Sequence, residues 1–423
     1  MELPKDIHMV GIGGIGMSAL AQLLVHRGVR VTGSDRDESP TTKLLNERGV
    51  DVEIGHGKRI PAATELLIYS DAVQADNSQR IEAREKGIPQ TSYFEMLGKI
   101  SASMRTIAVA GTHGKTTTTG MIAKILSDAG EKPTAVIGSI VRDFDSNFLA
   151  GRDDLFVVEA CEYRDHLLEL SPEILVITNI ELDHTDFFPS LSALQNTFRA
   201  TVEKVPASGA IIANPNDPNV AAVLKSVKAR VIDYTQKAVG SLQLVGEFNR
   251  ENARAALAAA QAAVPKLSQE AAVKSLSEFK GSWRRFEFKG ETQNGALVYD
   301  DYAHHPTAVA KTIQGAREKF PDKRIVVAFH PHLFSRTKSF LKEFAEALAK
   351  SDFAIIAPIY AAREKNDPTV SNHILAEAAG ENVIALDSFD EIRDALLEEK
   401  EGTLIITMGA GDIYKVAEQI TEE

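Results

Sequence analysis

Short runs of β-branched and apolar residues alternate along the chain with longer stretches in which apolar residues recur at helical spacing. The stretches Met17–His26 and Thr117–Ala129 are amphipathic and Ala253–Ala263 is rich in alanine, so we expect helices there. Alternating strands and helices predict α/β domains with mostly parallel sheets. We expect strands at Ile7–Val10, Val29–Thr32, Leu66–Tyr69, Thr106–Ala110, Phe156–Val158, Ile174–Thr178, Gly209–Ile212, Ile325–Phe329, Phe353–Ala357 and Leu404–Thr407.

The length of the chain, 423 residues, favours about three domains, since one domain commonly takes roughly 150 residues. The sequence shows no tandem repeat and no low-complexity linker, so the motifs decide the boundaries. Polar stretches at Gly98–Arg105 and Glu278–Trp283 each precede a cluster of motifs. We therefore predict domains over residues 1–100, 101–282 and 283–423.

The composition narrows the class of partner and the compartment. The chain has 47 basic and 59 acidic residues, a net charge of −12, which argues against binding to nucleic acid or to a membrane surface. Small phosphorylated ligands need only a local positive site and stay possible. Cys161 is the single cysteine, so an internal disulfide and a cysteine-cluster metal site are excluded. With no signal-peptide pattern and no membrane-length apolar run, we expect a cytoplasmic protein.

A glycine-rich loop follows the first expected strand and precedes the first expected helix. It reads Gly-Ile-Gly-Gly-Ile-Gly over residues 11–16, which is the G-x-G-x-x-G pattern of a pyrophosphate-binding turn. Asp35 lies about 20 residues farther on, where a carboxylate can bond a ribose hydroxyl. The loop therefore predicts a nucleotide diphosphate site. Taken alone it favours NAD, and a tight turn needed only for packing is the alternative.

A second loop has the chemistry of an ATP site in a shortened form. The standard phosphate loop is G-x-x-x-x-G-K-[ST], but Val109 stands where its first glycine belongs. The remaining G-x-x-G-K-T still offers backbone N–H groups and Lys115 to the phosphates, and the Thr116 hydroxyl to Mg²⁺. An alternative for the threonine run is helix capping. The residues expected at ATP here are Gly111, Thr112, His113, Gly114, Lys115, Thr116 and Thr117.

The stretch over residues 111–119 closely resembles the ATP loop of the Mur ligases, the amide-forming enzymes of peptidoglycan precursor synthesis. The segments 11–18, 283–286, 300–306 and 329–337 also resemble this family, in family order, and most closely its members that add L-alanine to UDP-N-acetylmuramate. The resemblance implies an ATP-dependent acid–amino-acid ligase that works through an acyl phosphate. It further implies ATP and two magnesium ions as cofactors, and UDP-N-acetylmuramate and L-alanine as substrates.

The resemblance also implies a role for each domain. Residues 1–100 would form a Rossmann-like domain that binds the UDP-sugar, so the first glycine loop is reassigned from NAD to the UDP diphosphate. Residues 101–282 would form a central P-loop ATPase-type domain, and residues 283–423 a Rossmann-like domain for the incoming amino acid. The residues implied at the UDP-sugar are Gly11, Gly13, Gly14, Gly16, Asp35 and Ser70.

The metal ligands implied by the resemblance are Thr116, Glu159 and His184. Glu159 ends the expected strand Phe156–Val158, and His184 closes a segment, residues 179–184, that resembles the family motif N-I-x-x-D-H. Carboxylates at strand ends suit a hard cation. Polar capping of strand ends is the alternative for both residues.

Further residues resemble the family's ATP and catalytic positions. Gly246, Asn249 and Asn252 match its G-x-x-N-x-x-N adenine motif, and a helix cap and a surface residue are the alternative for the two asparagines. Arg285 matches an arginine that meets the γ-phosphate, and Asp301 an aspartate that meets ATP. With Lys115, Glu159 and His184, Arg285 completes the implied catalytic set.

The amino acid would meet a cluster of cationic and neutral nitrogens in the last domain. These groups could bind the carboxylate or orient the amine, and no single general base is assigned. A structural salt bridge is an equal alternative for the arginine. The cluster is His304, His305, His332 and Arg336.

Several positions depart from the family pattern. Leu333 stands where the alanine-adding members usually carry arginine, which leaves glycine or L-serine open as the amine. Tyr163 is shared with the related ligase that attaches a recycled tripeptide, the second candidate. Arg199 replaces the carbamylated lysine of some relatives, as in the alanine-adding members. Cys161 replaces a common aspartate and is interpreted as a small buried residue.

Two other functional classes explain the sequence less completely. A nicotinamide-dependent dehydrogenase would use the first glycine loop but leave the ATP loop without a role. A catalytically inactive regulator would be expected to have lost Lys115, Glu159 or His184, all of which are present. The sequence leaves the oligomeric state open.

Overall fold

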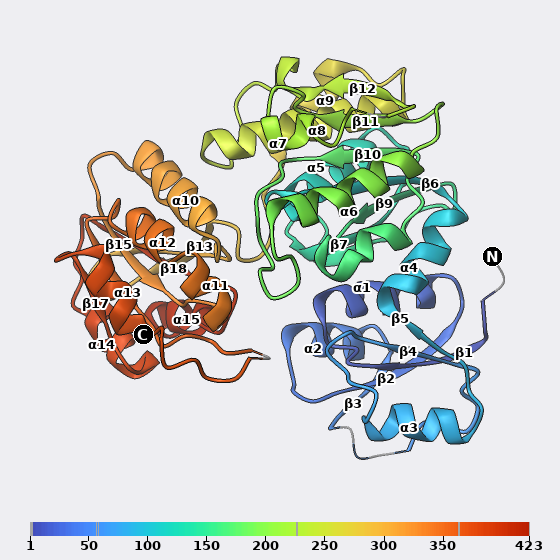
Figure 1. Cartoon of the computed structure of the whole chain (residues 1–423), viewed down its shortest axis with the longest axis horizontal. Coiled ribbons are helices and arrows are strands. Elements are labelled where there is room, and N and C mark those ends of the chain that lie inside the picture. Colours follow the sequence, from blue (N-terminus) through green and yellow to red (C-terminus); the bar gives the residue numbers. More distant parts are fainter. Residues whose placement is uncertain (1–2, 56, 58, 226, 363, 423) are drawn as a thin grey trace. The chain divides into compact units, whose positions relative to one another are not determined.

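The computed structural model describes residues 3–55, 57, 59–225, 227–362 and 364–422, and over these residues it contains three β-sheets flanked by helices (Figure 1). Each sheet lies within one of the three predicted segments. The expected class, an α/β chain with Rossmann-like and P-loop-type parts, is confirmed. Each expected strand is present, with ends displaced by at most three residues.

The first sheet is parallel throughout and has the strand order β3-β2-β1-β4-β5. The order reverses between β1 and β4, the kind of switch point at which α/β sheets bind ligands. Its strands are β1 (Asp6–Val10), β2 (Arg30–Asp35), β3 (Asp51–Ile54), β4 (Leu66–Tyr69) and β5 (Gln90–Ser92). The helices between and after them are α1 (Ile15–His26), α2 (Pro40–Glu47), α3 (Ser78–Glu85) and α4 (Tyr93–Ala102).

The second sheet has the order β12-β11-β10-β6-β9-β7-β8, and β8 runs antiparallel to β7. Because β10, β6 and β9 are parallel neighbours, their carboxyl ends meet at one edge. The strands are β6 (Arg105–Ala110), β7 (Thr134–Val141), β8 (Ser146–Leu149), β9 (Leu155–Glu159), β10 (Ile174–Ile177), β11 (Ala210–Ala213) and β12 (Arg230–Asp233). The helices of this part of the chain are α5 (Lys115–Asp128), η1 (Tyr163–Glu169), α6 (Leu191–Lys204), α7 (Pro218–Ala221), η2 (Tyr234–Gln236), α8 (Glu247–Ala263) and α9 (Gln269–Glu278).

The third sheet has the order β13-β14-β18-β15-β16-β17, with β13 antiparallel to β14. Its strands are β13 (Glu287–Glu291), β14 (Leu297–Asp301), β15 (Arg324–Phe329), β16 (Phe353–Ile356), β17 (Val383–Ala385) and β18 (Thr403–Met408). Its helices are α10 (Pro306–Lys319), α11 (Phe334–Ser339), α12 (Leu341–Leu348), α13 (Asn372–Ala379), α14 (Phe389–Leu397) and α15 (Tyr414–Glu422).

Alternation along a central strand shows why this third sheet is covered on both faces. In β15, Ile325, Val327 and Phe329 belong to one buried cluster, whereas Val326 and Ala328 belong to another. Successive side chains of a strand point to opposite faces, so a run without polar residues buries both. Among the described residues, no helix is long and apolar enough to cross a membrane.

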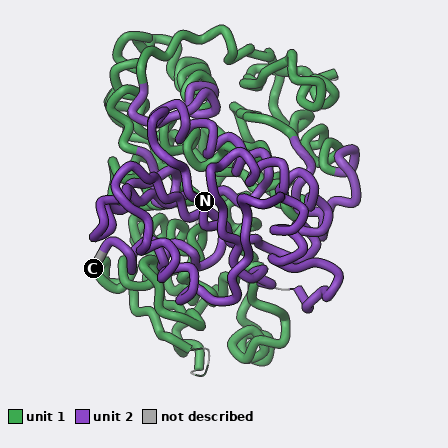
Figure 2. Tube along the Cα trace, turned by 90° about the vertical axis from the view of Figure 1, so that its left-hand side faces the viewer, with its two compact units in different colours: residues 1–180, 194–241, 252–280 green, residues 181–193, 242–251, 281–423 purple. Residues whose placement is uncertain are grey.

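The chain divides into two compact units (Figure 2). Unit 1 comprises residues 1–180, 194–241 and 252–280, and therefore holds the first two sheets. Unit 2 comprises residues 181–193, 242–251 and 281–423 and holds the third sheet. Two short segments from the middle of the chain thus belong with the C-terminal sheet. The boundaries near residues 100 and 282 remain predictions.

Candidate functional site

The phosphate loop joins β6 to α5 in unit 1 and depends on two glycines. Gly111 and Gly114 have φ angles of 129° and 83°, a region that side chains rarely adopt. A Cβ atom on Gly111 would lie 2.1 Å from Oγ1 of Thr178, and one on Gly114 would lie 2.2 Å from Oδ1 of Asn252. Helix α5 begins directly afterwards at Lys115, so its first backbone N–H groups point along the axis toward an incoming anion.

The loop is fixed from the neighbouring strand β10. Asn179 Oδ1 accepts a hydrogen bond from the His113 N–H at 2.9 Å, and Asn179 Nδ2 donates to the His113 carbonyl at 3.1 Å. Thr178 Oγ1 donates to the same carbonyl at 2.5 Å, and the Thr112 N–H donates to the Asn179 carbonyl at 3.2 Å. Two adjacent strand ends therefore hold the loop in one conformation.

Lys115 is held in place by an acidic partner within unit 1. Its Nζ donates to the carbonyls of Gly111 at 2.5 Å and Thr112 at 3.2 Å, and it pairs with Glu162 at 3.1 Å. The Glu162 side chain is only 1% exposed. Burial by itself would lower the pKa of Lys115, but Glu162 and its acidic neighbours raise it overall. The ammonium is therefore charged and close to the loop that would hold the phosphates.

Glu159 ends β9 at the same edge of the sheet, with Val109 of β6 as its partner in register. One of its oxygens accepts a hydrogen bond from the Gly138 N–H at 2.8 Å. The Thr116 hydroxyl stands in the first turn of α5. A carboxylate and a hydroxyl are hard oxygen donors of the kind that Mg²⁺ prefers, so these residues of unit 1 fit the metal that the sequence implies.

The capping alternative for the threonines is wrong. The residue that caps α5 is Gly114, and no side chain caps this helix. The threonines from Thr116 to Thr119 lie inside the helix and are buried, and Thr119 Oγ1 donates to the Lys115 carbonyl at 2.8 Å. Their placement in the helix packs α5 against its sheet and leaves the glycine to shape the loop.

The alternative for the two asparagines is also wrong. Asn249 and Asn252 lie within helix α8, and both are buried rather than at a cap or on the surface. Asn249 Nδ2 donates to the Val245 carbonyl at 2.7 Å. Asn252 approaches Gly114 of the phosphate loop closely enough to exclude a side chain there. Asn252 thus lies beside the predicted ATP site.

The first glycine loop lies at the switch point of the first sheet. Gly11 has a φ of 77°, and a Cβ atom on it would lie 2.9 Å from Cβ of Ser70, which follows β4. Asp35 Oδ2 accepts a hydrogen bond from the Gly13 N–H at 2.7 Å, and the Thr41 hydroxyl donates to the Gly13 carbonyl. The predicted residues from three strands are therefore brought together, and Asp35 braces the loop itself.

The remaining glycines of this loop open helix α1. Gly14 is the capping residue and is exposed. A Cβ atom on Gly16 would lie 2.6 Å from the ring of Tyr93, so only glycine allows this tyrosine to pack against the first turn. Burial raises the pKa of Tyr93 well above its usual value, which keeps the phenol neutral.

In unit 2, two adjacent arginines and two adjacent aspartates divide into a structural pair and a candidate ATP pair. Arg284 Nε donates to Asp300 Oδ2 at 2.7 Å, and both side chains are buried. Asp301 accepts a hydrogen bond from the Phe286 N–H at 2.7 Å. Burial raises the pKa of Asp301 to about 6, against the opposing charge of Arg285. Neighbours along a strand face opposite sides, which separates the two roles.

The predicted amino-acid cluster is brought together in unit 2. The rings of His304 and His332 have centroids 6.2 Å apart, and His332 Nδ1 lies 3.0 Å from Nη1 of Arg336. His304 Nδ1 lies 2.9 Å from the Tyr302 carbonyl, which indicates that Nδ1 carries the proton. Burial, and then the charge of Arg336, lower the pKa of His304 well below its usual value. His304 is therefore neutral, with Nε2 as an acceptor.

Arg336 also makes the salt bridge that was the alternative for it. Its Nε and Nη2 lie 2.9 Å and 2.8 Å from Oδ1 of Asp183. Burial alone would raise the pKa of Asp183, but Arg336 and then the neighbouring histidines hold it well below its usual value. His305, the fourth predicted residue, is buried at the start of α10.

Three known protein-family domains match consecutive parts of the chain. Residues 6–105 match the Mur ligase family catalytic domain, residues 109–241 the Mur ligase middle domain, and residues 284–411 the Mur ligase glutamate ligase domain. The chain belongs to the Mur ligase family. The three matches follow one another in the order of the three sheets described above.

Two Mur ligases with similar sequences carry the same name. The UDP-N-acetylmuramate–L-alanine ligase of Clostridium acetobutylicum is 36% identical, over 99% of this chain and 97% of the relative. That of Caldanaerobacter subterraneus subsp. tengcongensis is 37% identical, over 100% and 98%. The similarity therefore extends over the whole length of both proteins.

Solved Mur ligase structures show the same architecture. The UDP-N-acetylmuramate–alanine ligase of Thermotoga maritima has a TM-score of 0.80 at 26% identity, covering 99% of this chain and 98% of that one. A murein peptide ligase of Psychrobacter arcticus has a TM-score of 0.73 at 26% identity, covering 98% of each. The fold is thus shared with both kinds of enzyme that the sequence analysis considered.

Several residues of this Mur ligase act through their neighbours and were not predicted as site residues. Asn179 and Asp183 lie in the N-I-x-x-D-H motif, and Glu162 lies three residues after Glu159, but the sequence predicted no role for any of them. Arg284 and Asp300 were recognised only as motif letters. Of the first three, only Asp183 stands directly beside a predicted ligand, His184, and that position is the signal that could have found it.

Proposed function

We propose that this Mur ligase joins L-alanine to UDP-N-acetylmuramate at the expense of ATP, a step of peptidoglycan precursor synthesis. The observation that carries the proposal is the pair of glycine loops in unit 1. Each lies at the carboxyl ends of parallel strands in its own sheet, and the second presents Lys115 at a helix N-terminus. Two sites for nucleotide phosphates, and a lysine placed for phosphoryl transfer, suit a ligase that binds both a sugar nucleotide and ATP. The two substrates are inferred from the relatives that match over nearly their whole length and are named UDP-N-acetylmuramate–L-alanine ligase.

The reaction proceeds in two displacements. A carboxylate oxygen of UDP-N-acetylmuramate attacks the γ-phosphorus of ATP, which forms an acyl phosphate and releases ADP. The amine nitrogen of L-alanine then attacks the acyl carbon. The amide bond forms, phosphate leaves with the former carboxylate oxygen, and the nitrogen gives up a proton. The enzyme's contribution is positioning and charge.

The ATP residues are those that the sequence predicts. The N-terminus of α5 and Lys115 receive the phosphates, and Arg285 spreads the charge that develops on the γ-phosphoryl group. Asn249 and Asn252 bind adenine, and Asp301 contacts ATP. The loop residues that complete the site are Gly111, Thr112, His113, Gly114, Thr116 and Thr117.

The magnesium ligands are Thr116, Glu159 and His184, and we expect two ions. When bound, Mg²⁺ neutralises phosphate charge and orients the phosphoryl group. The oxygens of Thr116 and Glu159 at the edge of the second sheet support this assignment. The imidazole of His184 is the third proposed ligand.

The sugar nucleotide and the amino acid bind at separate places. Gly11, Gly13, Gly14, Gly16, Asp35 and Ser70 cradle the UDP diphosphate at the switch point of the first sheet. His304, His305, His332 and Arg336 receive L-alanine. The neutral state of His304 and its unprotonated Nε2 favour it for contact with an ammonium group, which has only hydrogen-bond donors to offer.

A phosphate-release assay with different amines tests the proposal. With UDP-N-acetylmuramate, ATP and Mg²⁺ present, we expect release only after L-alanine is added, and less or none with glycine or L-serine. Release with the L-alanyl-γ-D-glutamyl tripeptide alone would reassign the chain to the recycling ligase. Absence of turnover with every amine would refute the ligase function. Lys115→Ala should abolish release while UDP-sugar binding persists, because Lys115 lies in the other loop.

A further inference from the structure

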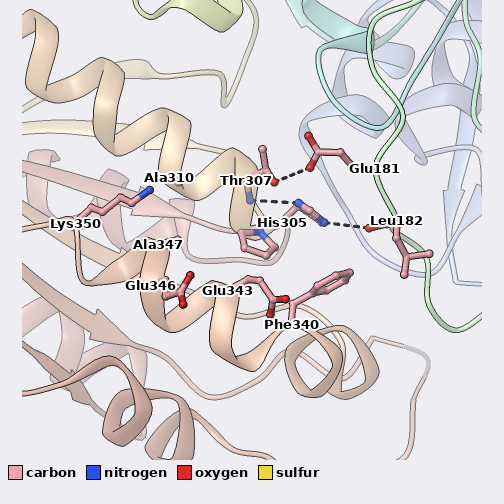
Figure 3. Close-up of a pocket in the computed structure, with 11 residues that line it drawn as sticks. Glu181, Leu182, His305, Thr307, Ala310, Phe340, Glu343, Glu346, Ala347 and Lys350 are labelled. Atoms are coloured by element: carbon pink, nitrogen blue, oxygen red, sulfur yellow. Dashed lines mark hydrogen bonds between the residues drawn. The ribbon is translucent and has the colours of Figure 1, made fainter. Parts of the chain in front are cut away.

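The segment 181–193 follows β10 in sequence but belongs to unit 2, where it packs. At its start, the Thr307 hydroxyl donates to Oε2 of Glu181 at 2.6 Å (Figure 3). Nε2 of His305 lies 3.2 Å from the Leu182 carbonyl, and Nδ1 of the same ring accepts the Thr307 N–H at 3.3 Å. Since Nδ1 accepts, Nε2 carries the proton and donates to Leu182. Two hydrogen bonds from the start of α10 therefore hold the first two residues of the segment.

The third residue of the segment makes the strongest of these contacts. Asp183 Oδ1 receives both Nε and Nη2 of Arg336, at 2.9 Å and 2.8 Å. The Asp183 and Arg336 side chains are 6% and 3% exposed, so water does not compete for either charge. The third guanidinium nitrogen, Nη1, is directed to His332 at 3.0 Å. The guanidinium is thus engaged on two sides within unit 2.

Asp183 also shapes the backbone of the next residue. His184 has a φ of 52°, a conformation that a histidine adopts only when its surroundings enforce it. Asp183 Oδ1 accepts the His184 N–H at 2.7 Å, and the His184 carbonyl accepts the N–H groups of Phe187 and Phe188 at 2.8 Å and 2.9 Å. Phe188 is buried, which anchors the turn from its far side. One carboxylate oxygen therefore serves both the salt bridge and the strained turn.

We propose that Asp183 and Arg336 are positioning residues, whose ion pair fixes the 181–193 segment, and with it the imidazole of His184, onto the part of the chain that binds the amino acid. The consequence for the reaction rests on the proposed function, in which His184 is a magnesium ligand. The structural consequence does not. Without the pair, the Asp183 carboxylate that accepts the His184 N–H is no longer held by Arg336, and the turn loses this attachment.

This role is in addition to the contact with the amino acid that is proposed above for Arg336. If Arg336 served only the carboxylate of the amino acid, its loss would weaken binding of that substrate and leave the segment in place. If it acts through Asp183, loss of either residue should loosen the same turn, and the two losses should not add, because each removes the same interaction.

Hydrogen exchange in the protein without metal or substrates tests the structural part. We expect the amides of Phe187 and Phe188 to exchange at least tenfold faster in Arg336→Lys and in Asp183→Asn. Asn keeps an oxygen for the His184 N–H but loses the charge, so Asp183→Ala, which loses both, should exchange faster still. The double variant Asp183→Asn with Arg336→Lys should match the single variants. Unchanged exchange in all of them would overturn the proposal.

A control pair separates this effect from a general loss of stability. Arg317 and Asp352 form an ion pair of similar length, 2.7 Å, in the same unit, but its side chains are 39% and 42% exposed. Asp352→Asn should leave the exchange of Phe187 and Phe188 unchanged. Equal acceleration in this control would mean that unit 2 as a whole has loosened, which contradicts a specific role for Asp183.

Kinetics test the functional part. Asp183→Asn should lower kcat and raise the Mg²⁺ concentration needed for half-maximal rate, with the KM for L-alanine unchanged within twofold. A raised KM for L-alanine in Arg336→Lys, with normal exchange and a normal Mg²⁺ requirement, would assign Arg336 to the substrate alone and refute the positioning role. If no amine is turned over, the proposed function fails, and the exchange experiment still decides the structural claim.

Discussion

The buried pair between Lys115 and Glu162 allows a quantitative test of how the phosphate loop is held. In Glu162→Gln the amide oxygen can still accept a hydrogen bond, but the charge 3.1 Å from the ammonium is lost. Breaking a buried ion pair by removing one partner costs about 3–5 kcal/mol. Lys115 keeps the carbonyls of Gly111 and Thr112, so we expect about 3 kcal/mol, at the low end.

A matched pair in the same unit gives the control. Arg105 and Glu173 are 3.0 Å apart, but their side chains are 51% and 36% exposed, so Glu173→Gln should cost at most about 1 kcal/mol. Chemical denaturation of both variants measures the difference in the free energy of unfolding, with the slope of that free energy against denaturant concentration unchanged. Mg²⁺ with ATP should stabilise Glu162→Gln more than the unchanged protein, because phosphate replaces the lost charge. Equal losses in the two variants, or no extra effect of nucleotide, would refute the reasoning.

Three further predictions concern single positions. Burial raises the pKa of Asp301 to about 6, so the stability that its neutral form provides is complete below pH 4 and is lost as the pH rises through 6. Asp301→Asn should remove this part of the pH dependence, about 3 kcal/mol, in denaturation measured from pH 4 to 7, and an unchanged dependence would contradict the assignment. Gly114→Ala places a Cβ against Asn252 at a left-handed φ, and should abolish ATP binding in calorimetry while UDP-sugar binding stays normal. Cys161 is half-buried and not buried as the sequence predicts. Desolvation still raises its pKa to about 12, so a thiol reagent at pH 8 should modify it at least tenfold more slowly in the native than in the denatured protein, and equal rates would place the thiolate in water.

The sequence predicted the elements that follow from local pattern and missed those that depend on neighbours. Strand Ile325–Phe329 is apolar throughout, and β15 is found there with one more residue. Strands β3 and β13 carry charged residues and escaped prediction, because they lie at the edges of their sheets, where one side is not covered. Exposure at an edge does not explain every missed strand, because β7 and β14 lie inside their sheets, are mostly buried and were not predicted either.

The site divides in the same way. Lys115 and Glu159 could be predicted, because Lys115 closes the loop between a strand and a helix, Glu159 ends a strand, and each belongs to a motif whose chemistry is specific. The attachment of His184 to unit 2 could not, because it depends on Arg336, which is 153 residues from Asp183 in sequence. Long-range ion pairs leave no period in a sequence, and only the fold brings their partners together.

The most direct test of the proposed ligation follows an oxygen atom. UDP-N-acetylmuramate labelled with ¹⁸O in its carboxylate is incubated with ATP, Mg²⁺ and L-alanine, and the released phosphate is analysed by mass spectrometry. If the carboxylate attacks the γ-phosphorus and the amine then displaces phosphate, each phosphate carries one oxygen from the labelled carboxylate. Phosphate without label, released while the amide product accumulates, would show that no acyl phosphate forms and would contradict the mechanism.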